Sequence, residues 1–173
     1  HGELKSGFRW WLAKATVLHV LTQIMAVLML FVLHKACGFT PASWSKAIIV
    51  ACMASIAFMS IQYFMNVAMG KVGSFLMLIF MVIQLAGSAG TYPVEISGAF
   101  VSKIHALVPF TYTVDAFRIA IAGKGSIVPC CIVMGVLVVV FSVLTVILFH
   151  FRAKWKETGR RCLYDFIEDK GLA

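Results

Sequence analysis

Charged residues are scarce in this chain. Of its 173 residues only 13% are charged, whereas 61% are hydrophobic and the mean hydropathy is +0.95. A soluble domain contains about 25% charged residues, so this chain has too few polar residues to cover a water-soluble core. Lipid is therefore its expected partner. The 15 Lys and Arg residues flank apolar runs, a pattern typical of membrane orientation, and no nucleic-acid partner is expected.

Motifs that bind cofactors or metals are also missing. The sequence has no G-x-x-x-x-G-K-[ST] phosphate loop, no C-x-x-C pair among its five cysteines and no H-E-x-x-H. We expect neither a metal nor a cofactor, and any ATP must be bound by another chain. Glu95, His105 and Asp115 could perform acid–base chemistry. No nucleophile motif accompanies them, so the sequence does not predict an enzyme.

Four apolar runs are long enough, or nearly long enough, to cross a bilayer, which takes about 20 residues of helix. They cover about residues 12–33, 44–69, 72–89 and 127–151. The predicted fold is an all-α, polytopic helical membrane protein, with residues 1–173 forming a single transmembrane domain. Because the chain begins at His1 without a methionine, we expect it to be the C-terminal part of a longer protein.

The segment 91–123, between the third and fourth runs, mixes polar and apolar residues. Placing Asp115 or Arg118 at mid-membrane costs about 3 kcal/mol each, and Pro109 interrupts a helix. We predict a broken two-helix hairpin, extracellular or re-entrant, that covers the outer side of the bundle. Gly123 and Gly125 are expected to end its second helix, and Asp115 is expected to pair with Arg118.

The distribution of basic residues predicts the orientation. With four spans, ten Lys and Arg lie on the side of both termini and five on the other. The positive-inside rule then places both termini in the cytoplasm, including a tail at 152–173.

Several polar side chains fall inside the predicted spans. Such side chains usually form hydrogen bonds between helices, but they could also line a polar pathway through the bundle. A face of small residues, Ala47, Ala51 and Ser55, would allow close helix contact. The intramembrane polar candidates are Gln23, Gln62, Asn66 and Gln84, and His19 lies one turn before Gln23.

The run from 84 to 123 reads QLAGSAGTYPVEISGAFVSKIHALVPFTYTVDAFRIAIAG. It resembles the C-terminal membrane domain of the YhgE/Pip (phage infection protein) family, within the type 2 ABC-transporter permease superfamily. The strongest matches are residues 90–95, His105 with 109–112, and 114–118. The resemblance implies a multi-pass protein of the cell membrane of Gram-positive bacteria, with earlier spans and an extracellular domain preceding this region.

The resemblance leaves two functions open. One is a permease-like component of an ABC-type transport or export system, which would dimerise and bind a separate ATPase subunit. The other is a non-transporting membrane anchor of a surface protein, acting as a phage receptor or a type VII secretion accessory. For a transporter, we expect an outer gate in the segment 91–123. Its candidate residues are Tyr92, Pro93, Glu95, His105, Pro109, Tyr112, Asp115 and Arg118.

Overall fold

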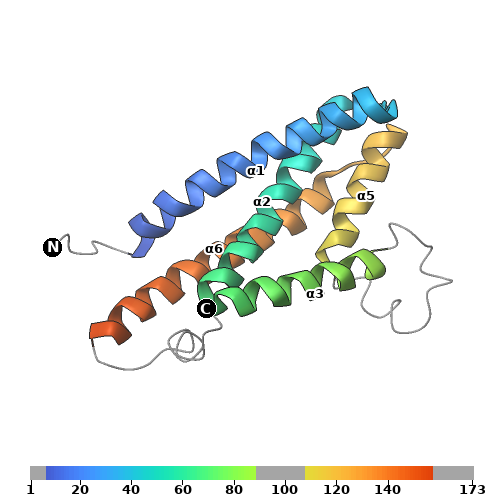
Figure 1. The fold of residues 1–173 in the computed structure, drawn as a ribbon. Helices are drawn as coiled ribbons and strands as arrows, with labels where there is room; N and C mark the ends of the chain where they lie inside the picture. The colour runs from blue at the N-terminus through green and yellow to red at the C-terminus, as the bar shows by residue number, and fades with distance from the viewer. Residues whose placement is uncertain (1–6, 89–107, 158–173) are drawn as a thin grey trace.

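The computed structural model describes residues 7–88 and 108–157, and every regular element in these two ranges is an α-helix. The helices are α1 (Gly7–Cys37), α2 (Trp44–Met69), α3 (Lys71–Gly87), α5 (Pro109–Ala122) and α6 (Val128–Glu157). They pack as one bundle, in which α2 contacts each of the other four (Figure 1). The all-α prediction is therefore confirmed for the described residues.

Three helices are long and apolar enough to cross a membrane, over Ala15–Cys37, Trp44–Met69 and Val128–Phe151. The second matches the predicted run 44–69. The first and third contain most of the predicted runs 12–33 and 127–151, but their helices are longer. In particular, α6 continues to Glu157, into the predicted tail. These three helices support a membrane protein.

The third predicted span differs from its expectation. α3 has 17 residues, which gives a length of about 26 Å against a hydrocarbon core of about 30 Å. It ends at Gly87, where the Ser88 amide donates to the Gln84 carbonyl oxygen. The prediction that 72–89 crosses the membrane as one complete helix is therefore not supported, and four complete spans are not found among the described helices.

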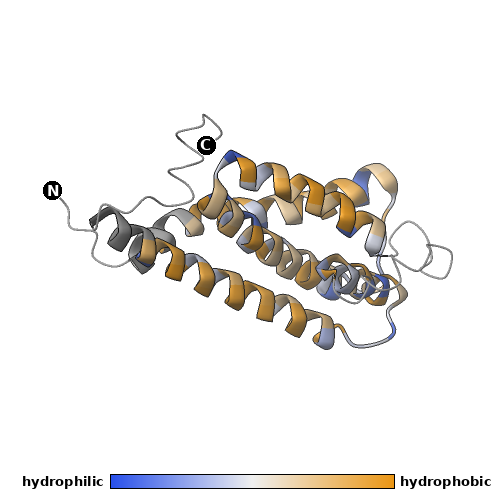
Figure 2. Cartoon of the chain, turned by 90° about the horizontal axis from the view of Figure 1, so that it is seen from below, coloured by the Kyte–Doolittle hydropathy of each residue, from blue (hydrophilic) through white to orange (hydrophobic). Residues whose placement is uncertain are grey.

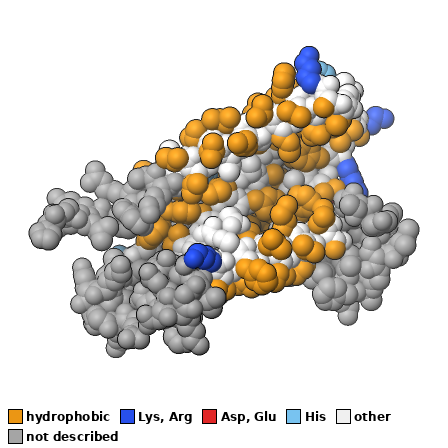
Figure 3. Space-filling view, viewed as in Figure 1, with side chains coloured by type: hydrophobic (Ala, Val, Ile, Leu, Met, Phe, Trp, Pro, Cys, Tyr) orange, Lys and Arg blue, Asp and Glu red, His pale blue; other side chains and the backbone are white. Residues whose placement is uncertain are grey.

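The described helices are hydrophobic along most of their length (Figure 2), and apolar side chains cover much of the face of the bundle that Figure 3 shows. Met81 of α3 is 72% exposed and Val17 of α1 is 68% exposed. An exposed apolar surface of this extent is unusual for a soluble monomer, whereas a bilayer would surround it with lipid tails. Other strongly exposed apolar residues on these helices and on α6 include Phe75, Leu78, Val82, Ile132 and Val139.

The core is built around small residues on α2. Ala47, Ala51, Ala54 and Ala57 are all buried, and small side chains allow helix backbones to approach closely. Two of the three residues of the predicted small face are therefore buried, and Ser55 is half-buried. One core cluster joins α2 to α5 and α6, and its members are Val50, Ala54, Ala57, Ala116, Ile127, Cys130 and Met134.

The connection between α2 and α3 is a single glycine. Gly70 has a φ of +59°, which favours glycine, and its amide donates to the Asn66 carbonyl oxygen. The Asn66 side chain accepts a hydrogen bond from Ser74. Close by, a Cβ atom placed on Gly73 would overlap the Met65 carbonyl oxygen. The two helices are therefore in direct backbone contact at this turn.

Candidate functional site at the junction of α3 and α5

The end of α3 meets the start of α5 through a buried amide side chain. Gln84 is only 3% exposed, and its Oε1 accepts a hydrogen bond of 2.9 Å from the Phe110 backbone amide. Pro109 occupies the first turn of α5, where its missing N–H leaves no donor unpaired. The next amide, of Thr111, donates to the Val108 carbonyl oxygen at 3.1 Å. Gln84 therefore satisfies an amide that α5 itself cannot satisfy.

This junction lies far from both ends of the bundle. The ring of Phe110 packs edge-on against Phe58 of α2, with the ring centroids 5.8 Å apart. Phe58 lies 14 residues after the start of α2 at Trp44, which corresponds to about 21 Å along the helix. Gln84 lies 13 residues after Lys71, the first residue of α3, which corresponds to about 20 Å. Both estimates place the junction near the middle of the bundle, measured along its helices.

The other end of α5 is held by the connection between α1 and α2. The amides of Ala42 and Ser43 donate to the carbonyl oxygens of Ile121 and Ala120, at 3.3 and 3.2 Å. These carbonyls belong to the last turn of α5, which has no helical partners of its own. Lys46 adds a 2.9 Å hydrogen bond from its Nζ to the Gly125 carbonyl oxygen. α5 is thus bonded at both ends to other helices or their connections.

The position of α5 differs from that of the predicted hairpin. α5 contacts α2, α3 and α6, and its residues Thr111, Thr113, Ala116 and Ala120 are buried. It lies beside the first half of α2 instead of covering the end of the bundle. As predicted, the second helix of this segment begins at Pro109 and ends before Gly123, which has a φ of +73°. The first half of the hairpin falls outside the described residues.

The predicted gate residues are only partly described. Tyr92, Pro93, Glu95 and His105 lie outside the described ranges. Asp115 and Arg118 form the expected ion pair, with 3.4 Å between Arg118 Nη1 and Asp115 Oδ1, and both side chains are about half exposed.

Tyr112 is half-buried against the core cluster. Pro109 and Tyr112 therefore lie at the start of α5, whereas the ion pair lies further along the helix.

Three of the four predicted intramembrane amides join two helices. Gln84 joins α3 to α5, and Asn66 joins α2 to Ser74 of α3. Gln23 of α1 donates from its Nε2 to Ser55 Oγ at 2.7 Å and to the Cys52 carbonyl oxygen at 3.3 Å. The Gln62 side chain is half-buried and makes no hydrogen bond to the rest of the described chain. Helix-to-helix hydrogen bonding thus explains Gln23, Asn66 and Gln84.

Two polar features of the bundle were not anticipated. Thr113 donates a hydrogen bond to the sulfur of Met134, at 3.6 Å. The hydroxyl oxygen of Tyr63 is buried, and no described residue bonds to it. Tyr63 lies in the apolar run 44–69 and Thr113 lies in the mixed segment 91–123, and neither pattern indicates these contacts, so hydropathy alone could not have found them.

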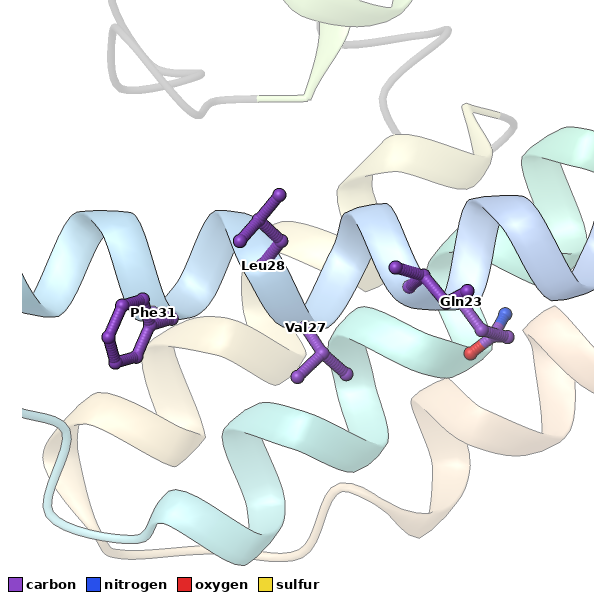
Figure 4. Close-up of a pocket in the computed structure, with 5 residues that line it drawn as sticks. Gln23, Val27, Leu28 and Phe31 are labelled. Carbon is purple, nitrogen blue, oxygen red and sulfur yellow. The ribbon is translucent and has the colours of Figure 1, made fainter.

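A shallow groove lies along one side of α1. It is lined by Gln23, Ile24, Val27, Leu28 and Phe31 (Figure 4). Its lining is apolar except for Gln23, whose amide nitrogen is already bonded to α2. Lipid tails fit such a surface, so the groove gives no indication of a polar substrate. Within residues 7–88 and 108–157, no three His, Cys, Asp or Glu residues gather to hold a metal ion.

Comparisons with known proteins give one informative relative. The chain is 29% identical over 161 residues to the uncharacterized protein YhgE of Bacillus subtilis (strain 168). The alignment covers 91% of this chain and 21% of the relative, so the chain spans about a fifth of that protein's length. No family profile and no solved structure matches.

The similarity supports a relationship with the YhgE family. It covers nearly the whole described bundle, including α3 and α5. The name of the relative assigns it no activity, so the membership in the permease superfamily stays a prediction.

Proposed function

We propose that this chain is the membrane-embedded, permease-like part of an ABC-type transport or export system of the bacterial cell membrane. Three long apolar helices and the relationship to YhgE support a membrane location. The observation that carries the transport proposal is the hydrogen-bonded break between α3 and α5. Transporters build substrate sites and gates from helices that are interrupted within the membrane.

In this proposal α3 and α5 together complete the third of four crossings. α3 rises from the turn at Gly70 to mid-depth, and α5 continues from mid-depth to the end where α2 begins. Their combined length of 31 residues corresponds to about 46 Å, which exceeds the hydrocarbon thickness. Backbone that leaves the helix at this depth must be surrounded by protein or water. The buried Gln84 supplies such a partner at the break.

The four-crossing arrangement places both ends of the described bundle on one side, and the excess of basic residues there makes that side cytoplasmic. A separate ATPase subunit and a second copy of the chain are the expected partners. The predicted gate residues within 89–107, above all Glu95, lie outside the described residues, and their proposed role rests on the sequence. Loss of transport in Glu95→Gln at normal membrane abundance supports a gate, whereas loss of abundance indicates a structural role.

The second candidate function is a membrane anchor for a surface protein, either a phage receptor or a type VII secretion accessory. One observation favours it. The chain matches only about a fifth of its relative, so most of that protein is available for recognition outside this bundle. An anchor needs no moving junction and no ATPase.

The two functions are separated by purifying the full-length protein from its native membrane and identifying bound proteins. Transport requires a stoichiometric ATP-hydrolysing subunit. If none is bound after mild extraction, the transport proposal is wrong and the anchor function is favoured. The junction itself is tested by a reversible lock. A Cβ on Gly87 would lie 3.9 Å from the Val108 Cβ, a distance that suits a disulfide.

The lock combines Gly87→Cys with Val108→Cys in a background without other cysteines. If the junction moves during transport, oxidation abolishes the ATP hydrolysis of the purified complex, and reduction restores it. The two single-cysteine variants under the same oxidant are the controls. Unchanged hydrolysis in the locked protein would show that the junction is static, even if an ATPase is bound.

A further inference from the structure

Basic side chains gather at the end of the bundle where α1 ends and α2 begins (Figures 1 and 3). Lys124 is exposed there, and Lys46 is half-buried. The Nζ atom of Lys46 donates a 2.9 Å hydrogen bond to the Gly125 carbonyl oxygen, on the connection between α5 and α6. An ammonium group has several N–H donors, so Lys46 keeps donors for a further acceptor. The bond holds its ammonium group at the connection that also carries Lys124.

Within the described residues, acidic side chains do not balance these charges. The described chain has one acidic residue near this end, Asp115, and it pairs with Arg118. The first turns of α2 and α6, which both begin here, contain no Asp or Glu. Helix N-termini carry partial positive charge themselves, so they add to the charge of the two lysines. The described part of this end is therefore electropositive and attracts anionic groups.

Both lysines lie at the boundaries of the apolar spans. The span of α2 begins at Trp44, two residues before Lys46, and the span of α6 begins at Val128, four residues after Lys124. The Trp44 side chain is partly exposed, and tryptophan is enriched where a membrane meets water. The two ammonium groups therefore lie at the level of the lipid headgroups, where phosphate oxygens are the abundant anionic acceptors.

Exposed apolar side chains continue from the lysines toward the middle of the bundle. Ile49 lies three residues after Lys46 and is exposed, and residues three apart share one face of a helix. On α6, Val128 and Ile132 are exposed as well. Further along, the Met53 side chain of α2 lies beside Gly135 of α6. A basic end is thus followed by a lipid-accessible apolar surface on both helices.

The apolar groove on α1 reaches the level of Lys46. The hydrogen bond from Gln23 to Ser55 fixes how α1 and α2 lie side by side. Phe31, at one end of the groove, lies eight residues after Gln23, which corresponds to about 12 Å. Lys46 lies nine residues before Ser55 on the antiparallel α2, which corresponds to about 14 Å. The groove therefore extends from the level of Lys46 toward the middle of the bundle (Figure 4).

We propose that this end of the bundle binds an anionic phospholipid, with the lipid phosphate at Lys46 and Lys124 and an acyl chain along Ile49 and the α1 groove. A soluble anion would use the lysines alone, and a neutral lipid would use the apolar surface alone. The two together select a lipid that carries a net negative charge. Such a lipid would link α1 and α2 to the connection between α5 and α6. The site does not depend on the proposed transport function.

The test is native mass spectrometry of the full-length protein, released from nanodiscs that contain equal amounts of phosphatidylglycerol and phosphatidylcholine. We expect the protein to retain phosphatidylglycerol in excess. Lys124→Gln should lower this retention about fivefold, the contribution of one basic side chain near a membrane surface. Lys46→Gln should lower it at least as much. Lys124 bonds no described residue, so its loss leaves the described contacts intact.

Lys71→Gln is the matched control. It removes the same charge from an exposed lysine at the turn between α2 and α3, at the other end of the bundle, and should leave the retention unchanged. Equal retention of the two lipids by the unaltered protein would overturn the proposal, as would an equal loss in Lys124→Gln and Lys71→Gln. If glycerol phosphate, which has no acyl chains, binds as tightly as phosphatidylglycerol, the site accepts a soluble anion and the lipid proposal is wrong.

Discussion

The two ends of α3 are attached to the bundle in different ways. At its start, Gly73 brings the backbone of α3 against the Met65 carbonyl of α2. At its end, attachment relies on side chains, through the Gln84 bond to Phe110 and the contact of Gly87 with Val108. Backbone contact leaves no room to adjust, whereas a hydrogen bond can be exchanged. The comparison indicates a helix that is fixed at one end and releasable at the other.

The largest effect is expected from Gly73→Ala. The new methyl group would overlap backbone atoms of Met65, which cannot move aside as a side chain would. We expect a loss of about 3 kcal/mol or more, at the upper end of overpacking effects, seen as a lower thermal unfolding temperature in detergent. The control is Gly135→Ala on α6, where the added Cβ would meet only the Met53 Cε at 3.8 Å. Equal stability of the two variants would contradict the fixed end of α3.

The next effect is expected from Gln84→Leu at the releasable end. It leaves the Phe110 amide buried without its partner, which costs about 1–3 kcal/mol. The measurement is again thermal unfolding, combined with the rate of disulfide formation between Gly87→Cys and Val108→Cys, which should fall if the junction loosens. Gln62→Leu is the matched control, since its side chain bonds no described residue. If both substitutions had the same effect, Gln84 would not hold the junction.

A smaller effect is expected between α1 and α2. Gln23→Leu removes the 2.7 Å hydrogen bond to Ser55, and such bonds within membranes contribute about 0.6 kcal/mol on average. A double-mutant cycle with Ser55→Ala measures the interaction directly. A coupling energy of zero would show that the bond contributes nothing to the association of α1 with α2.

The smallest effect is expected from the ion pair on α5. Asp115 and Arg118 are both about half exposed, and exposed pairs contribute about 0–1 kcal/mol. Asp115→Asn should therefore change the unfolding temperature little. If it instead abolished function at normal abundance, the exposed face of α5 would have a role in gating.

Only part of this difference between the two ends of α3 could be predicted from the sequence. The sequence predicts the helix Trp44–Met69 directly, because an apolar run of this length lies between two residues that bound a helix. The Ser43 side chain caps its start, and Gly70 follows its end. The contacts that hold the releasable end of α3 could not be predicted from the sequence. Gln84 and Phe110 are 26 residues apart, and nothing local to either one specifies the other.

The hydropathy of the sequence also could not predict where α5 packs. Asp115 and Arg118 made this segment resemble an external hairpin, but they pair on the exposed face of the helix. The opposite face, with Thr113, Ala116 and Ala120, is buried against the bundle. Polar threonines can be buried in this way because their hydroxyls find partners inside, as Thr113 does on Met134. The average polarity of the segment does not show which face of the helix is exposed and which face is buried.

The bonds from the connection at 38–43 to the end of α5 also set an order in time during synthesis. Ala42 and Ser43 are made well before their partners, Ile121 and Ala120. At about 5–20 residues per second, the ribosome needs roughly 4–15 s to add the 77 residues between Ser43 and Ala120. During that interval the two amides have only water as a partner, because an unpaired amide in hydrocarbon costs several kcal/mol. The newly made hairpin of α1 and α2 must therefore keep its turn at the membrane surface until α5 arrives.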